Sequence, residues 1–306
     1  MKISLIIPTK NRKSDLRNAI LSVISQKRIP DELIIVDQSR DLDIKINIEE
    51  LLYKSRVKIN TIYIYDANIN GLVEAKKSGF ASSSGDIICF IEDDVILQND
   101  YLLMVEKHFA SNPKMLGCCG IDINFFHSSN LYIGLYNLTH RGIFKDYGIE
   151  IKRQKSSNFC DDYVYESNFL SGGISSWKRL VIEKIPFDTD NNFHYLEDID
   201  YSTRASYIFG NAFYIIPSIK LTHNFSNINR ESLSVLYTKK VTEYIIFFKK
   251  RKGRNDASKF HLSILLLGIF CESILKSFRY YTLGPALGVL IGSVKGAKKN
   301  VLNIYN

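Results

Sequence analysis

Short apolar runs alternate with stretches of helical apolar spacing along the first third of the chain. The apolar runs, which predict strands, lie at residues 3–7, 33–36, 59–65 and 87–91. Apolar residues recur at helical spacing between and after these runs, at residues 16–24, 48–53, 71–82 and 101–109. Strands that alternate with helices in this way predict an α/β fold with a mostly parallel, Rossmann-like sheet flanked by helices.

Three of the predicted strands are followed directly by polar residues. In open α/β sheets, ligands bind outside the carboxyl ends of the strands. We therefore expect a single ligand-binding edge that brings together Thr9, Asn11, Arg12, Asp37, Glu92, Asp93 and Asp94.

The pattern changes twice in the rest of the chain. Between residues 116 and 217 the periodicity weakens, and Gly172 and Gly173 indicate a close approach of the backbone. We interpret residues 1–230 as one domain, with a ligand-binding half at about 1–115 and a second half at about 116–230. Residues 231–306 then form a basic and apolar helical extension.

Two apolar stretches in this extension follow a dense basic run. The run contains Lys249, Lys250, Arg251, Lys252 and Arg254. The apolar stretches at 260–271 and 280–294 are twelve and fifteen residues long, shorter than the ~20 residues that span a bilayer. We expect a pair of helices that lies in the plane of an anionic membrane surface, behind a basic patch. The alternative is that both helices simply pack on the domain.

Net charge and cysteine content narrow the setting. Lys and Arg outnumber Asp and Glu by 40 to 32, and the pI of about 9.0 favours an anionic partner such as nucleotide, nucleic acid or lipid headgroups. The five cysteines, Cys160 among them, form no Cys-x-x-Cys pair and have no histidine at zinc-site spacing. A reducing compartment is the simpler interpretation, and the run at 3–7 is too short for a signal peptide.

The most informative cluster is Glu92, Asp93 and Asp94, directly after a predicted buried strand. Three adjacent carboxylates repel one another unless a cation or strong hydrogen-bond donors compensate. Carboxylate oxygens suit Mg or Mn, which proteins commonly hold through one or two carboxylates and the phosphates of a substrate. The cluster predicts a divalent metal and a phosphorylated ligand; the alternative is a solvated acidic turn.

A second acidic cluster contains Glu197, Asp198 and Asp200 and leads into a predicted helix. A carboxylate at this position can act as a general base toward an attacking hydroxyl. The alternative is an ordinary acidic first turn, which suits the helix dipole.

Four other side chains each have a functional and a structural interpretation. Asp37 can accept from the N–H of a nucleotide base or be a turn residue. Arg12 can bind phosphate or lie in a solvated loop. His223 can bind a metal or diphosphate or be a structural histidine. Trp177, the only tryptophan, can stack on a sugar or belong to the core.

Five segments taken together resemble the inverting glycosyltransferase family 2, which has the GT-A fold. The resemblance covers residues 2–230, and its segments lie at 4–12, 34–39, 85–95, 171–177 and 196–204. The segment at 85–95 resembles the strand that leads to the family's Asp-x-Asp motif, with Glu92 in place of the first Asp. In the helix at 71–82 this chain has Lys76 and Lys77 where the family usually has Arg and Asn.

The resemblance implies a role for each matching residue. Donor nucleotide-sugar contacts are expected from Pro8, Thr9, Asn11, Arg12, Asp37, Lys76, Glu92 and Asp93. The metal, Mn or Mg, is expected at Asp94, Glu92 and His223. Asp198, with Glu197, is expected to be catalytic, and sugar contacts are expected from Gly172, Gly173, Trp177 and Arg204.

The implied activity is transfer of a sugar from a nucleoside-diphosphate sugar to an acceptor hydroxyl, with inversion. The implied acceptor is a glycan or lipid-linked saccharide of a bacterial surface polysaccharide, at the inner face of the cell membrane. The protein itself is expected to be cytoplasmic and peripheral on that membrane, and no nucleic acid partner is expected. Two alternatives are a sugar nucleotidyltransferase and a noncatalytic membrane-associated assembly protein. The first would need a Gly-rich phosphate loop after the first strand, and residues 8–14 contain no Gly.

Overall fold

A computed structural model describes residues 1–40, 43–124, 130–145, 163–228, 230–254 and 257–301. The chain divides into two compact units. The first contains Met1–Phe126, Tyr147–Asn192 and Tyr201–Asn229, and the second contains His127–Asp146, Phe193–Asp200 and Arg230–Asn306. The second unit therefore includes two segments that precede the extension predicted to begin at residue 231.

The first unit contains the sheet and the helices that flank it. Its strands are β1 (Ile3–Thr9), β2 (Glu32–Asp37), β3 (Asn60–Tyr65), β4 (Ile87–Phe90), β5 (Val95–Leu97), β6 (Gly117–Asp122), β7 (Tyr165–Glu166), β8 (Ser175–Lys178) and β9 (Phe213–His223). Its helices are α1 (Lys13–Ile24), α2 (Asp43–Ser55), α3 (Leu72–Ala81), α4 (Tyr101–Ser111), the 3₁₀ turn η2 (Gly172–Ile174) and α7 (Arg179–Lys184). Helix α8 (Glu197–Phe209) begins in the second unit and continues in the first.

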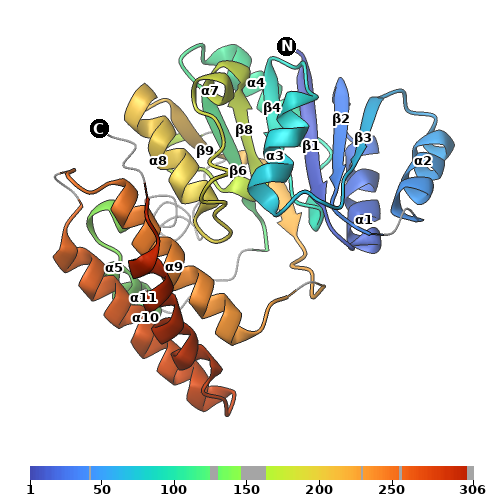
Figure 1. Cartoon of the computed structure of the whole chain (residues 1–306). Coiled ribbons are helices and arrows are strands. Elements are labelled where there is room, and N and C mark those ends of the chain that lie inside the picture. Colours follow the sequence, from blue (N-terminus) through green and yellow to red (C-terminus); the bar gives the residue numbers. More distant parts are fainter. Residues whose placement is uncertain (41–42, 125–129, 146–162, 229, 255–256, 302–306) are drawn as a thin grey trace. The chain divides into compact units, whose positions relative to one another are not determined.

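The described strands form a nine-stranded sheet in the order β3-β2-β1-β4-β8-β6-β9-β5, with β7 paired to β9 (Figure 1). Strands β3, β2, β1 and β4 are parallel, and β6 is parallel to β9. Strand β8 runs antiparallel to β4 and β6, and β5 runs antiparallel to β9. The β5–β9 pairing brings the start of β5, just after the acidic cluster, next to the end of β9.

The four apolar runs form the parallel side of this sheet, β3-β2-β1-β4, as the sequence predicts. Every residue of β1, β2 and β4 is buried, because helices such as α3 pack against these strands. Gly79 on α3 lies where an added Cβ would be 2.5 Å from a methyl of Ile6, so only a glycine allows this approach of helix to strand. The predicted α/β class with a parallel sheet and flanking helices is confirmed.

The second unit is helical and has its own apolar core. It contains α5 (Asn130–Thr139), the 3₁₀ turn η1 (Gly142–Phe144), α9 (Leu233–Lys250), α10 (Lys259–Arg279) and α11 (Gly284–Lys298). Glycines on one face of α11 let it pack closely on α9: a Cβ on Gly288 would lie 2.4 Å from the carbonyl oxygen of Ser234. Tyr237, Val241 and Phe247 of α9 are at the centre of the core.

The basic run at the end of α9 forms the predicted surface patch only in part: Lys252 is exposed, but two other members of the run face inward. Lys250 and Arg251 are buried, at 1% and 0% side-chain exposure, and both contact the carboxylate of Asp200. The Lys249 ammonium donates to the backbone carbonyls of Gly296, Ala297 and Lys299 at the end of α11. A run of like charges in a sequence does not reveal which of its side chains face inward toward a carboxylate or a helix end.

Helix α10 extends beyond its uncharged stretch. It has 21 residues and is long and apolar enough, by length and composition, to cross a membrane. The helix continues through Glu272 because this carboxylate is paired with Lys240 at 3.1 Å and Lys276 at 3.6 Å. Among the described cysteines, Cys89, Cys118 and Cys119 are buried and Cys271 is exposed, all as free thiols, while Cys160 lies outside the described residues.

Candidate functional site

The loops after β1 and β2 meet at the carboxyl edge of the sheet. The N–H of Asn11 donates to the Ser39 hydroxyl at 2.7 Å, and the N–H of Gln38 donates to the carbonyl of Thr9 at 2.9 Å. Asn11 has a φ of 55°, a left-handed conformation that asparagine adopts more readily than most residues. These bonds hold the loop that follows Pro8 and Thr9 at the end of β1 beside the loop after Asp37.

Asp93 fastens this loop to the acidic cluster. Its carboxylate accepts from the Thr9 hydroxyl at 2.7 Å and from the Arg12 guanidinium at 2.9 Å, and the residue is 3% exposed. Burial raises the pKa of Asp93 to about 6, although Thr9 and Arg12 both oppose this shift. Both oxygens of Asp93 therefore hold the chain together in this structure, and its predicted contact with a nucleotide sugar stays a prediction.

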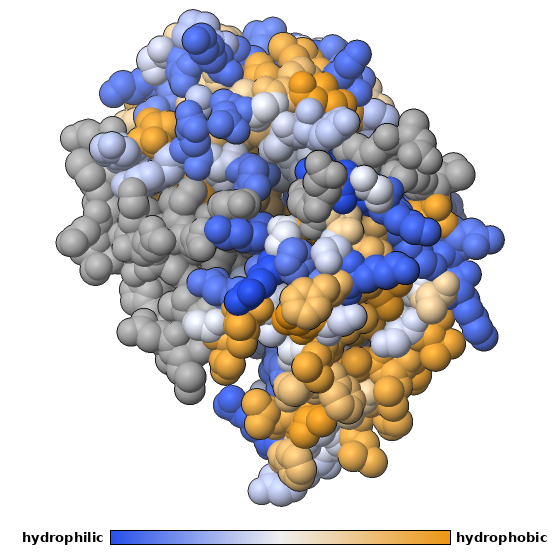
Figure 2. Space-filling model, turned by 90° about the vertical axis from the view of Figure 1, so that its left-hand side faces the viewer, coloured by the Kyte–Doolittle hydropathy of each residue, from blue (hydrophilic) through white to orange (hydrophobic). Residues whose placement is uncertain are grey.

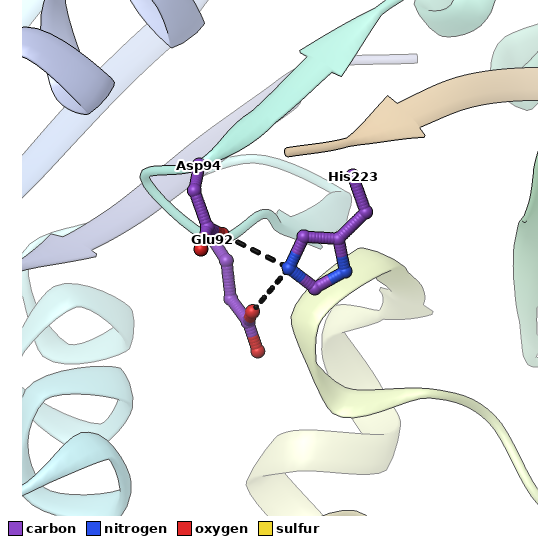
Figure 3. Close-up of side chains that lie close together, drawn as sticks. All are labelled: Glu92, Asp94 and His223. Carbon is purple, nitrogen blue, oxygen red and sulfur yellow. Dashed lines mark ion pairs between the residues drawn. The ribbon is translucent and has the colours of Figure 1, made fainter. Parts of the chain in front are cut away.

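Glu92, Asp94 and His223 form a cluster of potential metal ligands (Figure 3). The Nε2 atom of His223 lies 3.2 Å from a carboxylate oxygen of Glu92 and 3.0 Å from one of Asp94. One ligand atom from each of the three residues lies within 4.8 Å of the other two. Strand pairing explains the arrangement, because His223 at the end of β9 is directly opposite Val95, which follows Asp94.

The charges of the cluster are balanced by protein cations. Burial would raise the pKa of Asp94, but His223, the N–H of Ser226 at 2.9 Å and the Arg12 charge lower it below its usual value. Burial would lower the pKa of His223, yet Asp94 and Glu92 raise it to about 10. Histidine binds a metal only when neutral, so a metal ion at this site has to displace the imidazole proton. The residue types fit a hard divalent ion: two carboxylates and one imidazole.

The glycine pair packs directly against Glu92. The N–H of Glu92 donates to the carbonyl of Gly173 at 2.9 Å, and the Lys76 ammonium donates to the carbonyl of Gly172 at 2.9 Å. Lys76 is only 3% exposed, so it supports the glycine segment from within. A Cβ on Gly173 would lie 2.3 Å from Oε1 of Glu92, which means that the glycine leaves room for this carboxylate.

A Gly173→Ala substitution is expected to weaken metal binding about 10- to 100-fold, because the new methyl displaces the Glu92 carboxylate from the cluster. Stability should change little, since the displaced group is the end of a flexible side chain. Calorimetric titration with Mn²⁺, together with a thermal melt, measures both effects. Gly134→Ala is the control, because its added methyl meets nothing within 4 Å. Unchanged Mn²⁺ affinity in Gly173→Ala would contradict the proposed ligand set.

Asp37 is fully buried at the end of β2. One oxygen accepts from the N–H of Ser39 at 2.8 Å, and the other accepts from the Tyr63 hydroxyl at 2.6 Å. Burial and the neighbouring Asp37 charge raise the pKa of Tyr63 well above its ordinary value. The carboxylate is therefore fixed in position, and its predicted contact with a nucleotide base stays a prediction.

The second acidic motif begins helix α8 in the second unit. Of its three carboxylates, Glu197 and Asp200 are buried, at 8% and 1% exposure, and Asp198 is partly exposed. Asp198 accepts from the N–H of Ile199 at 2.8 Å. A base must reach its substrate, so exposure within the motif favours Asp198 over its neighbours. The catalytic role predicted for Asp198 and Glu197 remains a prediction.

Trp177 belongs to the core. It is 3% exposed, and its ring packs against Tyr201 at 5.1 Å and Phe213 at 5.3 Å between centroids. The sugar-stacking interpretation is wrong, because no ring face is left for a ligand. Arg204 donates to the carbonyl of Pro186 at 2.7 Å and lies over the Tyr201 ring, which fixes one side of its guanidinium in the first unit.

Sequence reasoning missed three partners of the site. Ser226 holds Asp94 through its backbone N–H, and a main-chain donor carries no signal in the sequence. Tyr63 holds Asp37 from the neighbouring strand β3, and a register of parallel strands would have been needed to find it. Phe225 stacks on the His223 ring at 4.0 Å between centroids. In the sequence, only its position two residues after His223 suggested this contact.

Comparisons with known proteins agree on one family. The family model described as Glycosyl transferase family 2 matches residues 4–163. The O-antigen chain rhamnosyltransferase RfbN of Salmonella typhimurium is 24% identical over 188 residues, 60% of this chain and 55% of the relative. A Campylobacter jejuni protein named GalNAc(5)-diNAcBac-PP-undecaprenol beta-1,3-glucosyltransferase is 28% identical over 123 residues, 40% of this chain and 39% of the relative. The matches span about half the length of these curated relatives, or less.

Solved structures share the fold at low sequence identity. A mannosyltransferase from Pyrobaculum calidifontis, PcManGT, in complex with GDP-Man and Mn²⁺, superposes with a TM-score of 0.61 at 12% identity and covers 97% of this chain and 87% of that one. The S. aureus protein TarS in complex with UDP-GlcNAc superposes with a TM-score of 0.57 at 14% identity, over 92% of this chain and 76% of that one. These likenesses support the predicted GT-A fold.

Proposed function

Because the family model covers more than half of its length, the chain belongs to glycosyltransferase family 2, and we propose that it is a metal-dependent glycosyltransferase. It transfers a sugar from a nucleoside-diphosphate sugar to an acceptor hydroxyl by direct displacement, with inversion at the anomeric carbon. The observation that carries the proposal is the cluster of Glu92, Asp94 and His223 at the carboxyl edge of the sheet.

Each part of the site has a task in this reaction. Asp94, Glu92 and His223 would hold Mn²⁺ or Mg²⁺, which would supply positive charge to stabilise the departing diphosphate. The loop after β1, which contains Asn11 and Arg12, lines the donor site. Asp37 accepts a hydrogen bond from the nucleotide base. Its anchoring by Ser39 and Tyr63 suits this role, because it holds the carboxylate in one position. No covalent sugar–enzyme intermediate is required.

The acceptor side is assigned to the glycine segment and to helix α8. Gly173 leaves room for the Glu92 carboxylate at the metal cluster, and the contacts with the sugar are assigned to Gly172 and Gly173 beside it. Arg204, on helix α8, is assigned to sugar binding. Asp198, with Glu197 beside it, deprotonates the acceptor hydroxyl as that oxygen attacks.

We infer a glycan or lipid-linked saccharide as the acceptor, at the inner face of a bacterial membrane, with the protein cytoplasmic and peripheral. The relatives named for O-antigen and undecaprenol-linked substrates support this choice. Large apolar side chains gather over α10 and α11 in the lower part of Figure 2. Those more than half exposed on the two helices and their connection are Phe260, Leu267, Leu275, Phe278, Tyr280, Tyr281, Leu283, Leu290 and Val294.

The charge of these helices suits anionic lipid. The segment 259–301 contains six basic residues and one acidic residue, Glu272. Apolar side chains of this extent on a monomer mark a contact surface, and flanking basic residues favour anionic headgroups. Membrane binding is therefore assigned to the α10–α11 surface, in place of the buried end of α9.

Replacing Leu287 and Leu290 on α11 with Glu is expected to lower binding to phosphatidylglycerol vesicles at least about tenfold, since two apolar contacts become charged. Vesicle co-sedimentation at low and high salt measures the effect. The control places two Glu at Ile46 and Tyr53 of α2, which are exposed at 62% and 86%. Undiminished binding by the α11 variant would refute the assignment. Point substitutions are preferable to removing residues after Phe248, which would also remove Lys250 and Arg251.

Calorimetry with UDP, GDP, dTDP and CDP, each with and without Mn²⁺, tests the proposed donor site. Metal-dependent binding of one nucleotide is the expected result, and the nucleotide identified then guides a transfer assay with its sugar derivatives. Failure of all four to bind would favour the noncatalytic alternative. Binding of a nucleoside triphosphate with release of pyrophosphate would favour a nucleotidyltransferase.

A further inference from the structure

We propose that Glu243 of α9 is a positioning residue for the catalytic Asp198, an inference that rests on the proposed function. The Glu243 carboxylate accepts three backbone hydrogen bonds from the segment that leads into α8. Its Oε1 accepts from the N–H of His194 at 3.0 Å, and its Oε2 accepts from those of Tyr195 at 2.7 Å and Leu196 at 3.0 Å. Asp198 follows this segment by two residues.

The contact requires a carboxylate. Three consecutive N–H groups ahead of a helix are an anion site, because the helix dipole adds to the positive ends of the N–H bonds. Glu243 is 7% exposed, so water does not replace it as their partner. A glutamine at this position keeps only one acceptor oxygen, and its amide N–H groups would face backbone N–H groups.

The same helix holds the far side of the motif. The Lys250 ammonium donates to Oδ1 of Asp200 at 2.7 Å, and the Arg251 guanidinium donates to the same oxygen at 3.1 Å. Glu243 thus fixes the chain directly before Asp198. Lys250 and Arg251, at the end of α9, fix it two residues after Asp198, at Asp200. All these contacts lie within the second unit.

This double anchoring suits a general base. A base acts only when its oxygen is held at the correct place and angle, and a displacement of about 1 Å can cost 10²-fold in rate. Asp198 itself remains partly exposed and able to meet an acceptor. The rigid part of the motif is therefore its backbone on either side, which Glu243 and the Lys250–Arg251 pair control.

The test compares Glu243→Gln with wild type and with Glu272→Gln, a partly buried carboxylate that contacts α9 elsewhere. In Glu243→Gln we expect kcat to fall about 10- to 100-fold with the KM for the donor within about twofold. Glu272→Gln should keep its kcat. Hydrogen exchange at the amides of His194, Tyr195 and Leu196 should become faster only in the Glu243 variant.

A double-mutant cycle separates positioning from general loss of structure. Added to Asp198→Asn, the Glu243→Gln change should lower the residual rate by less than about twofold, because the base it positions is already absent. Equal losses in the two backgrounds would overturn the proposal. Glu243→Asp, which keeps the charge, is the second variant if the Gln form does not fold, and it should lose less activity than Glu243→Ala.

Hydrogen exchange distinguishes a failure of the anchoring by Glu243 from a failure of the proposed function. Wild-type protein that transfers no sugar, with any donor that it binds, would overturn the proposed function. Unchanged amide exchange in Glu243→Gln would overturn the anchoring by Glu243, whatever the activity.

Discussion

An Asp94→Asn variant is expected to lose metal-dependent nucleotide binding, and its transfer rate should fall at least about 10²-fold. The amide has almost the same shape as the carboxylate and can still accept the Ser226 N–H at 2.9 Å, so the local fold is kept. What disappears is the negative charge 3.0 Å from Nε2 of His223, and with it the strongest ligand of the cluster for a hard cation.

Mn²⁺ titrations in two buffers of different ionisation enthalpy measure this change. The pKa of His223 is raised to about 10 by Asp94 and Glu92, so the imidazole carries a proton at neutral pH in the metal-free protein. Metal uptake by wild type should therefore release a proton, and the apparent affinity should weaken as the pH falls. The control is Asp86→Asn. Asp86 directly precedes β4, the strand that leads to the acidic cluster, and its carboxylate accepts from the N–H of Lys2. Full Mn²⁺-dependent binding by Asp94→Asn would rule out the ligand set.

The sheet was predictable because its signal is strong and local. Strands β2 and β4 are buried on both faces and are therefore unbroken apolar runs, at residues 33–36 and 87–90, followed by polar residues of the site. The partners of those polar residues were less predictable. Asp93 and Lys76 have the residue types of ligands, but burial at 3% exposure turns both inward, and no spacing rule reveals that. Trp177 was undecided for the same reason.

The helical unit illustrates a different limit. A basic run has the same appearance in the sequence whether it faces lipid or pairs with a buried carboxylate, and Lys250 and Arg251 do the second. Charge within α10 ended the predicted apolar stretch at residue 271, although Lys240 and Lys276 neutralise Glu272 and let the helix continue to Arg279. Both cases depend on contacts between residues that are far apart in the sequence.

Asp198→Asn is expected to lower kcat about 10²- to 10⁴-fold, the range of a positioned general base, and to leave Mn²⁺-dependent nucleotide affinity unchanged. The donor site is built from the loops that follow β1, β2 and β4 and from the end of β9, all in the first unit, whereas Asp198 belongs to the second unit. Since an ionised carboxylate is the active form, the part of the low-pH decline that persists at saturating Mn²⁺ should also be absent from the residual activity of the variant. Single-turnover transfer at saturating donor, measured across pH, tests both statements.

The control for Asp198→Asn is Asp190→Asn, an exposed carboxylate eight residues earlier that no role has been assigned to. Loss of nucleotide affinity together with kcat would mean that Asp198 supports the fold of the site, while full turnover would remove it from the mechanism. Either result would redirect attention to Glu197, which is 8% exposed and so would need α8 to move before it met an acceptor. The partly exposed Asp198 lies between the buried Glu197 and Asp200 in a segment that α9 anchors on both sides, and it is accessible without such a movement.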